Sequence, residues 1–258
     1  MLKKKSLGQH FLHNPYYLSL IADSADITPG ERVLEVGPGE GALTRELLAR
    51  GAKVVAIEKD HRLIPVLKEK FEKEIKAKQL TLVEGDALEL TPAQAKIRGS
   101  YKVVANIPYY ITGALIKKFL SEKNPAGTLV LLVQKEVAQR IAREKKESIL
   151  SLSVKVYGEP AYIKTVPRGA FNPAPTVDSA ILRVSGVSRT NFKNAAAEAR
   201  FFVILKAGFG QKRKFLKRNL ENVLGGNINE LFKDAGIADN ARAEDVSLPQ
   251  WLALAKIA

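Results

Sequence analysis

The sequence predicts an α/β protein, in which an open β-sheet with helical crossovers is followed by a small all-helical C-terminal domain. Short apolar runs alternate with amphipathic stretches between residues 32 and 184, a pattern typical of strands joined by right-handed helical crossovers. After Val187 the pattern changes, because residues 190–258 contain three or four helical stretches and no convincing strand. We therefore expect two domains, at residues 1–187 and 188–258.

The expected elements follow one another in regular order along the first domain. Residues 1–30 begin as a basic arm, continue as a short helix and end in the turn Thr28-Pro29-Gly30. We expect strands at 32–36, 53–58, 80–86, 101–106, 128–134, 149–166 and 179–184. We expect helices at 42–50, 61–75, 113–122 and 135–145. Pro65 fits the second of these helices because it lies near the first turn.

Composition narrows the class of function. The chain is 46% hydrophobic, which is enough for a substantial core, and its net charge of +14 favours nucleic acid as a partner over a merely lysine-rich surface. It has no cysteine, which excludes a disulfide framework and fits a cytoplasmic protein. No apolar run approaches the roughly 20 residues of a membrane-spanning helix. The histidines are not spaced as metal ligands, so we expect no metal. We also expect no membrane contact, because the sequence has no long basic amphipathic helix with an aromatic face.

A glycine-rich loop, Glu35-Val36-Gly37-Pro38-Gly39-Glu40-Gly41, follows the first expected strand. Its glycines leave the backbone bare where a strand turns into a helix, so a ligand can approach the helix N-terminus. The spacing is G-x-G-x-G, whereas dinucleotide enzymes use G-x-G-x-x-G. Glu35 precedes the glycines and suits a ligand with a positive amino group. We expect Glu35, Gly37 and Gly39 to contact the ligand.

Acidic residues follow the next two strands as well. Glu58 ends the second strand, where a carboxylate can accept both ribose hydroxyls of a nucleoside. Asp86 follows the third strand and can accept a hydrogen bond from an adenine amino group, with Ala87 leaving room for the ring. No lysine or arginine cradle for phosphate accompanies these acids. The pattern therefore favours a cationic nucleoside, S-adenosyl-L-methionine, and NAD is the weaker candidate.

The stretch Asn106-Ile107-Pro108-Tyr109 follows the fourth strand, beside the expected cofactor site. The side-chain oxygen of Asn106 and the carbonyl oxygen of Ile107 can accept hydrogen bonds from the exocyclic amine of a base. Pro108 fixes both acceptors beforehand, which is electrostatic preorganisation. Tyr109 offers a face for stacking, worth about 1–3 kcal/mol, and Phe171 can enclose the base from the other side. The alternative is that Asn106 caps a helix while both rings fill the core.

Taken together, these motifs closely resemble the rRNA adenine dimethyltransferase family, and its small-subunit branch in particular. The resemblance covers nearly the whole chain and rests on LGQHFL (7–12), EVGPGEGALT (35–44), EGDAL (84–88), NIPYYIT (106–112), LLVQKEVAQR (131–140), AFNPAPTVDSAILR (170–183) and GFGQKRKFLKRNL (208–220). It implies a Rossmann-like, S-adenosylmethionine-dependent methyltransferase domain. It also implies methylation of N6 of two adjacent adenosines in a hairpin loop near the 3′ end of small-subunit rRNA, within a 30S precursor.

The resemblance also implies roles for individual residues. It implies cofactor contacts by His10, Leu12, Gly37, Glu58, Asp86 and Asn106. It implies that the target adenine is held by Asn106, Tyr109 and Phe171. His10 departs from the family pattern, in which many members have Asn, although either side chain can bind the carboxylate end of the cofactor. The alternative for His10 is a surface histidine of the basic arm.

A basic segment near the C-terminus is expected to hold the RNA. Its densest part contains Lys212, Arg213, Lys214, Lys217 and Arg218, and no acid interrupts the chain from Arg200 to Leu220. Phosphate contacts of this kind position RNA without reading its sequence and make the affinity salt-dependent. The alternative is a solvated helix face. Further positive charge comes from Lys3, Lys4, Lys5, Arg140, Arg143, Lys145 and Lys146.

The sequence leaves three other functions open. The first is the antibiotic-resistance branch of the same family, which methylates one adenine of large-subunit rRNA. The second is a ribosome-assembly factor that binds rRNA and has lost the chemistry, although the intact NIPY stretch and glycine loop argue against it. The third is an NAD-dependent oxidoreductase. We expect a monomer that works in the cytoplasm.

Overall fold

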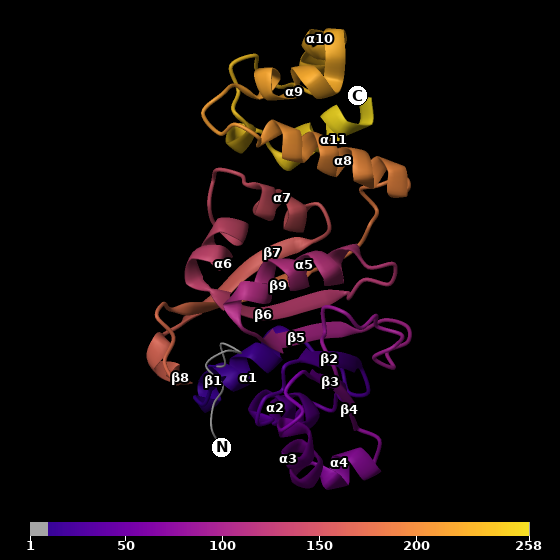
Figure 1. Cartoon of the computed structure of the whole chain (residues 1–258), viewed down its shortest axis with the longest axis vertical. Coiled ribbons are helices and arrows are strands. Elements are labelled where there is room, and N and C mark those ends of the chain that lie inside the picture. The colour runs from indigo at the N-terminus through magenta and orange to yellow at the C-terminus, as the bar shows by residue number, and fades with distance from the viewer. Residues whose placement is uncertain (1–9, 258) are drawn as a thin grey trace. The chain divides into compact units, whose positions relative to one another are not determined.

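The structure, a computed structural model, describes residues 10–257 and divides into two compact units (Figure 1). Unit 1 contains the chain up to Ala138 together with Glu159–Val187, and unit 2 contains Gln139–Gly158 and the chain from Ser188 onward. The sequence led us to expect a division only after residue 187, and the structure in addition assigns residues 139–158 to unit 2. The roles expected of the two parts stay predictions.

A seven-stranded sheet with the order β4-β3-β2-β5-β6-β9-β7 forms the centre of unit 1. Its strands are β2 (Arg32–Val36), β3 (Lys53–Glu58), β4 (Leu80–Glu84), β5 (Lys102–Asn106), β6 (Thr128–Gln134), β7 (Glu159–Val166) and β9 (Ser179–Ser185). Strands β2 to β6 pair in parallel, and β9 is antiparallel to β6 and β7. The strand order reverses between β2 and β5, and open α/β sheets bind ligands beyond the carboxyl ends of the strands at such a point.

Helices connect these strands, which confirms the α/β fold. They are α1 (Pro15–Ser24), α2 (Ala42–Ala49), α3 (Leu63–Lys70), α4 (Glu72–Lys76), α5 (Thr112–Ser121) and α6 (Lys135–Ala142), with 3₁₀ turns η2 (Tyr109–Ile111) and η3 (Arg168–Ala170). Two short strands, β1 (Phe11–Leu12) and β8 (Phe171–Asn172), pair separately. The single helix expected at 61–75 is divided at Phe71, whose buried ring lies against Gly41 of the glycine loop.

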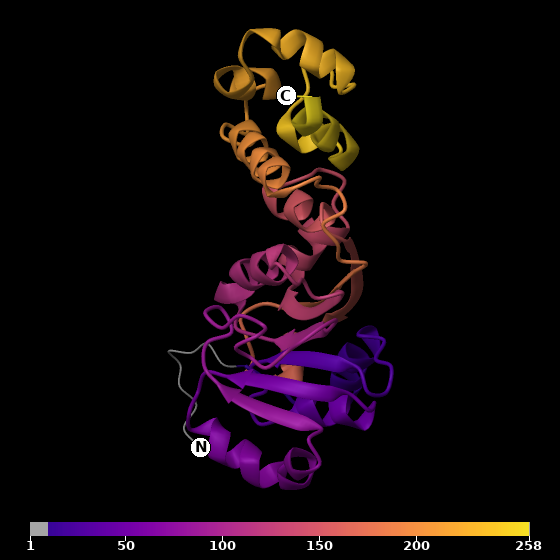
Figure 2. The same cartoon turned by 90° about the vertical axis from the view of Figure 1, so that its right-hand side faces the viewer.

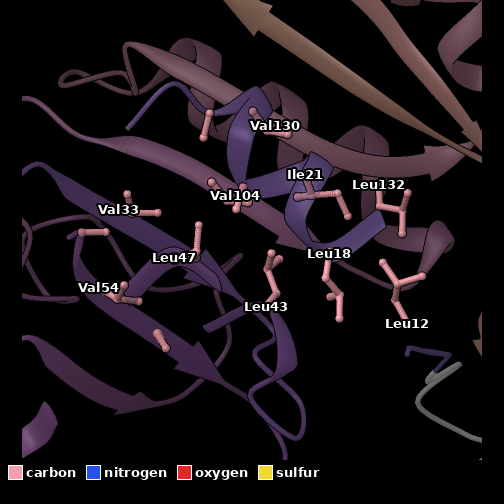
Figure 3. Packing of buried hydrophobic residues seen from close by; sticks show 14 of the residues in the cluster. Leu12, Leu18, Ile21, Val33, Leu43, Leu47, Val54, Val104, Val130 and Leu132 are labelled. Atoms are coloured by element: carbon pink, nitrogen blue, oxygen red, sulfur yellow. The ribbon is translucent and has the colours of Figure 1, made fainter. Parts of the chain in front are cut away.

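The apolar core beside β2, β3, β5 and β6 explains why these segments form a buried parallel sheet. Strands covered on both faces are near-continuous apolar runs, and β6 is buried at six successive positions from Thr128 to Val133. Figure 3 shows side chains of this core from the strands, from α1 and α2, and from β1: Val33, Val54, Val104, Val130, Leu132, Leu18, Ile21, Leu43, Leu47 and Leu12. Leu12 joins the core although it lies in the N-terminal segment.

Unit 2 is helical, as expected for the C-terminal part. Its helices are α7 (Ile149–Lys155), α8 (Ala195–Gly208), α9 (Leu216–Leu224), α10 (Ile228–Asp234) and α11 (Leu248–Ile257), with 3₁₀ turns η4 (Gly225–Asn227) and η5 (Ala243–Asp245). The last four helices are the orange and yellow ones in Figure 2. Trp251 is fully buried and stacks on Phe209 with the ring centroids 5.8 Å apart. Gly208 leaves room for the Trp251 ring, because a Cβ there would collide with it.

One expected strand is partly wrong. Residues 149–166 were expected to be extended throughout, but they begin with helix α7 before β7 starts at Glu159. The alternating apolar pattern of 149–156 fits a strand, but Ser148 and Ser151 form a capping box. Ser148 Oγ accepts from the Ser151 N–H at 3.1 Å, and Ser151 Oγ accepts from the Ser148 N–H at 2.7 Å. Two satisfied N–H groups favour the helix start over the strand.

Candidate functional site

A pocket of about 280 Å³ opens in unit 1 at the carboxyl ends of β2, β3 and β5. Every residue expected to contact the cofactor or the base lines it, except Glu35: His10, Leu12, Gly37, Gly39, Glu58, Asp86, Ala87, Asn106, Tyr109 and Phe171. Segments far apart in the sequence therefore converge where the strand order reverses, which is where this type of sheet binds ligands.

The glycine loop is closed against the end of β3. The Gly39 N–H donates to Glu58 Oε2 at 3.1 Å, and the Asp60 N–H donates to Glu58 Oε1 at 2.8 Å. Gly39 has φ +59°, and a Cβ there would lie 2.8 Å from Cε1 of Phe11. Burial raises the pKa of Glu58, and the two backbone N–H groups partly offset that effect. Only glycine fits this loop, and the carboxylate at its edge is held in a fixed orientation.

Glu35 lies behind the glycine loop and is not part of the pocket lining. It is 1% exposed, and its Oε2 accepts a hydrogen bond from Thr44 Oγ1 of α2 at 2.7 Å. Its other oxygen, Oε1, has no hydrogen-bond partner among the described residues. Burial raises the pKa of Glu35 to about 8, and the charge of Glu58 adds to this. The geometry thus gives Glu35 the role of linking β2 to α2, and its expected contact with a ligand has no support from the lining.

Asp86 is held by Lys59, a residue that we did not expect at the site from the sequence. Lys59 Nζ lies 2.7 Å from Asp86 Oδ2, and the Leu88 N–H donates to Asp86 Oδ1 at 2.8 Å. The ammonium group of Lys59 holds the pKa of Asp86 below its usual value. Lys59 and Lys70 both line the pocket, but Lys70 Nζ donates to the carbonyl oxygen of Glu40 at 2.6 Å, so both ammonium groups bind protein oxygens. The position of Lys59 directly after Glu58 was the available signal.

Asn106 is the last residue of β5 and faces the end of β2, since a Cβ on Gly37 would lie 3.9 Å from the Asn106 carbonyl oxygen. Neither the 3₁₀ turn η2 nor helix α5 has a side-chain cap, so Asn106 does not cap the following helix. The carboxamide forms no hydrogen bond with the rest of residues 10–257. It is therefore free to bind a ligand in the pocket.

The ring of Tyr109 is held in place from two sides. Its hydroxyl lies 2.6 Å from Ser179 Oγ at the start of β9, and burial raises its pKa. The imidazole of His10 stacks on the Tyr109 ring with the centroids 6.3 Å apart and the planes inclined by 22°. A base that stacks on Tyr109 must use the face that His10 leaves open, or displace His10.

The pairing of β1 with β8 brings the N-terminal segment to the pocket. Leu12 is opposite Phe171 in this ladder, and both side chains are buried, with 2% and 6% exposed. His10 Nδ1 lies 2.9 Å from the carbonyl oxygen of Pro173, which can only accept, so Nδ1 carries the proton. The Nε2 of a neutral ring is then an acceptor. This Nε2 can accept a hydrogen bond from the ammonium group of an amino acid, whereas the sequence led us to expect His10 at the carboxylate end of the cofactor.

The basic segment lies in unit 2. Lys212, Arg213, Lys214 and Arg218 are exposed, and none of them forms an ion pair within the described part of the chain. Lys217 differs, because its Nζ lies 2.8 Å from Asp239 Oδ1 and it is less available for phosphate. Lys146 binds Glu244. Lys3, Lys4 and Lys5 of the expected basic arm lie outside the described residues.

Residues 10–257 contain no group of three or more His, Asp and Glu side chains placed to hold a metal ion. No helix in the same range is both long and apolar enough to span a bilayer.

The chain is similar to known proteins over almost its whole length. A family model described as "Ribosomal RNA adenine dimethylase" matches residues 1–258. "Ribosomal RNA small subunit methyltransferase A" of Dehalococcoides mccartyi strain CBDB1 is 42% identical over 255 residues, covering 96% of this chain and 86% of the relative. The protein with the same description from Fusobacterium nucleatum subsp. nucleatum is 39% identical over 260 residues, covering 98% and 97%.

Two solved structures share the fold across nearly the whole chain. A dimethyladenosine transferase from Plasmodium falciparum superposes with a TM-score of 0.78 at 28% identity, covering 95% of this chain and 96% of that one. The 23S rRNA methyltransferase ErmE gives a TM-score of 0.77 at 28% identity, covering 95% and 98%.

Proposed function

The chain belongs to the ribosomal RNA adenine dimethylase family, and from this premise we propose that it dimethylates N6 of two adjacent adenosines in a 3′-terminal hairpin loop of small-subunit rRNA. This modification would give it a role in the biogenesis of the small subunit. The observation that carries the proposal is the free carboxamide of Asn106, which lies in a pocket at the switch point of the sheet. That placement is what a site for a nucleobase amine requires.

S-adenosyl-L-methionine is the methyl donor, and when bound it supplies a methyl group on a positively charged sulfur. The residues present fit this cofactor, because the bare backbone at Gly39 closes on Glu58 and leaves no room for a Cβ. Glu58 would accept from the ribose hydroxyls, and Asp86 would accept from the adenine amino group beside Ala87. Nε2 of His10 would accept from the ammonium group of the methionine part.

The residues of the NIPY stretch perform the proposed chemistry. Asn106 Oδ1 and the Ile107 carbonyl oxygen accept the two N–H groups of the target amine, which turns the nitrogen lone pair toward the methyl group. Pro108 restricts the backbone that carries both acceptors before the base arrives, which limits the reorganisation that accompanies the transfer. Tyr109 stacks on the base, which must first leave its own stack. Transfer would be direct, without a covalent enzyme intermediate: the new N–C bond would form as the S–C bond of the donor breaks, and the methylated amine would then lose one proton to water.

The second methylation sets a further condition on this site. A monomethylated amine has one N–H left, so one of the two acceptors, Asn106 or Ile107, loses its partner and the amine must rotate. The site therefore has to hold the base by stacking as well as by hydrogen bonds, which is the role proposed for Tyr109 and Phe171.

The small-subunit substrate is favoured over the large-subunit one by the relatives. The two bacterial small-subunit methyltransferases are 42% and 39% identical to the chain, whereas the 23S rRNA enzyme ErmE is 28% identical. The RNA would bind the exposed cations of unit 2, Lys212, Arg213, Lys214 and Arg218, with a smaller contribution from Lys217. We expect the protein to act as a monomer on the 30S precursor, in the cytoplasm.

The test is methyl transfer from labelled S-adenosyl-L-methionine to purified 30S precursor and, separately, to 23S rRNA. We expect incorporation only into 30S particles, and mass spectrometry of the digested rRNA should find N6,N6-dimethyladenosine at two adjacent positions. Incorporation only into 23S rRNA would move the chain to the resistance branch. Binding of the 30S precursor without methyl incorporation would make the protein an assembly factor. Calorimetric titration with S-adenosyl-L-methionine and with NAD tests the last alternative, an NAD-dependent oxidoreductase.

A further inference from the structure

An aromatic ring is exposed within the basic segment of unit 2. Phe215 is 52% exposed and directly follows the exposed cations Lys212, Arg213 and Lys214. It lies in the loop between α8 and α9. Its neighbour Leu216 is fully buried and already supplies the apolar contact of this part of the loop with the helices. Core packing alone therefore does not account for a large apolar side chain at position 215.

Helix stability does not account for Phe215 either. The residue is the N-cap of α9, with φ −62° and ψ 145°, and it makes no side-chain cap hydrogen bond. Ser, Thr, Asn or Asp at this position would accept a bond from the first turn and stabilise the helix by about 0.5–2 kcal/mol. The first turn of α9 instead has no capping oxygen from residue 215, and its dipole favours a nearby anion.

Cations from three separate segments act on one carboxylate near this loop, that of Glu244. The Leu216 N–H donates to the carbonyl oxygen of Ala241 at 2.8 Å, which brings the segment containing Arg242 beside Phe215. Lys146 binds Glu244 and lowers its pKa, and Arg242 and Lys212 lower that pKa further. Lys146, Lys212 and Arg242 therefore lie around one carboxylate. We call Lys212 and Arg242, with Arg213, Lys214 and Arg218, the basic surface, and we leave out Lys146 because it is paired with Glu244.

The loop that carries Phe215 is ordered by its own hydrogen bonds. Asn219 Nδ2 donates to the carbonyl oxygens of Gly208 at 2.6 Å and Gln211 at 3.1 Å. The Lys214 N–H donates to the Gln211 carbonyl oxygen at 3.0 Å. Because the backbone is fixed before binding, a ligand that meets Phe215 loses little affinity to loop ordering.

We propose that Phe215 stacks on an unpaired base of the substrate rRNA while the basic surface contacts the phosphates on either side of that base. A flat ring among unpaired cations matches single-stranded RNA, which offers base faces and phosphates together. The inference rests on the proposed function, since it takes rRNA as the substrate. It adds a base contact in unit 2 to the pocket in unit 1.

The experiment compares affinity for 30S precursor and for naked small-subunit rRNA over a range of salt concentrations. Phe215→Leu keeps an apolar side chain without a ring, and Phe215→Trp keeps a ring. We expect Phe215→Leu to weaken binding to both RNAs about tenfold without changing the slope of log affinity against log salt, and Phe215→Trp to retain wild-type affinity. Lys214→Gln is the matched charge control, and it should reduce the slope by about one unit.

Three results would overturn the inference. Phe215→Leu could bind both RNAs like the wild type, Phe215→Trp could bind as weakly as Phe215→Leu, or the loss could be confined to assembled particles. The last result would show that Phe215 contacts a ribosomal protein. Methylation of 30S precursor by the wild type is measured in parallel. If the wild type methylates, a failure concerns Phe215 alone, whereas absence of methylation would overturn the proposed function.

Discussion

The backbone N–H of Gly39 donates to Oε2 of Glu58 at 3.1 Å and so joins the glycine loop after β2 to the last residue of β3. On its other side the loop meets the ring of Phe11, whose Cε1 would lie 2.8 Å from a Cβ on residue 39. Gly39 is therefore the point where three segments meet: the N-terminal segment with Phe11, the loop after β2, and the end of β3. This contact shapes the part of the pocket in which we propose that the cofactor binds.

Gly39→Ala is expected to weaken cofactor binding at least tenfold. The new Cβ must displace Phe11 or open the loop away from Glu58, and φ +59° is strained for alanine by about 1–2 kcal/mol. The measurement is calorimetric titration with S-adenosyl-L-methionine. Gly186→Ala is the matched control, because Gly186 has φ +61° with nothing within 4 Å of the added Cβ. Equal affinity for both variants would contradict the proposed closure of the loop.

Tyr109→Phe and Ser179→Ala are each expected to lower kcat by roughly fivefold, the value of about 1 kcal/mol for one hydrogen bond. The hydroxyl of Tyr109 lies 2.6 Å from Ser179 Oγ, and removing either group frees the ring from β9. The double variant should be no slower than the slower single variant, because both changes remove one interaction. Additive effects would show that the two residues act separately.

A matched control for the loss of a tyrosine hydroxyl lies in β7. The hydroxyl of Tyr162 is 2.6 Å from Thr165 Oγ1, and neither residue lines the pocket. Tyr162→Phe should leave kcat unchanged. A fall similar to that of Tyr109→Phe would mean that hydroxyl removal acts through general stability.

Glu35→Gln is expected to change how stability depends on pH. Burial raises the pKa of Glu35 from 4.5 to about 8 in the folded chain, so the folded state holds this proton more tightly than the unfolded state. The protonated Glu35 therefore contributes to the free energy of unfolding fully below pH 4.5, and this contribution is lost as the pH rises toward 8. The free energy of unfolding of the variant relative to the wild type should therefore rise over this window, by a few kcal/mol in order of magnitude.

Urea unfolding at a series of pH values measures this difference, and Glu31→Gln is the control. Burial of Glu31 opposes its ionisation, but the hydrogen bond from Lys102 lowers its pKa overall. Its contribution is present above pH 4.5 and is lost only at lower pH. The difference in free energy of unfolding between Glu31→Gln and the wild type should not change between pH 5 and pH 8. A flat Glu35→Gln difference in that range would show that Glu35 is ionised in the fold.

The strand ends were predictable from the sequence because each carries its own local signal. The glycines after Val36, the acid Glu58 and the Gly85-Asp86 pair all follow apolar runs, and parallel strands bring their carboxyl ends together. Glu35 could not be placed in this way. Its side-chain direction depends on the pleat and on Thr44 in the next helix, and neither shows in a single strand's pattern.

Contacts between distant segments could not be predicted from the sequence. The proximity of Lys146, Lys212 and Arg242 depends on how the helices of unit 2 pack, and so does the assignment of residues 139–158 to that unit. The same holds for the stacking of His10 on Tyr109, which depends on the pairing of β1 with β8.

The most direct test of the account concerns the carboxamide of Asn106. The measurement is the single-turnover rate of methyl transfer to 30S precursor at saturating S-adenosyl-L-methionine, for Asn106→Ala beside the wild type. We predict a rate at least about a hundredfold lower, because one acceptor for the target amine is gone, with 30S affinity within about twofold of the wild type. A rate within threefold of the wild type would contradict it.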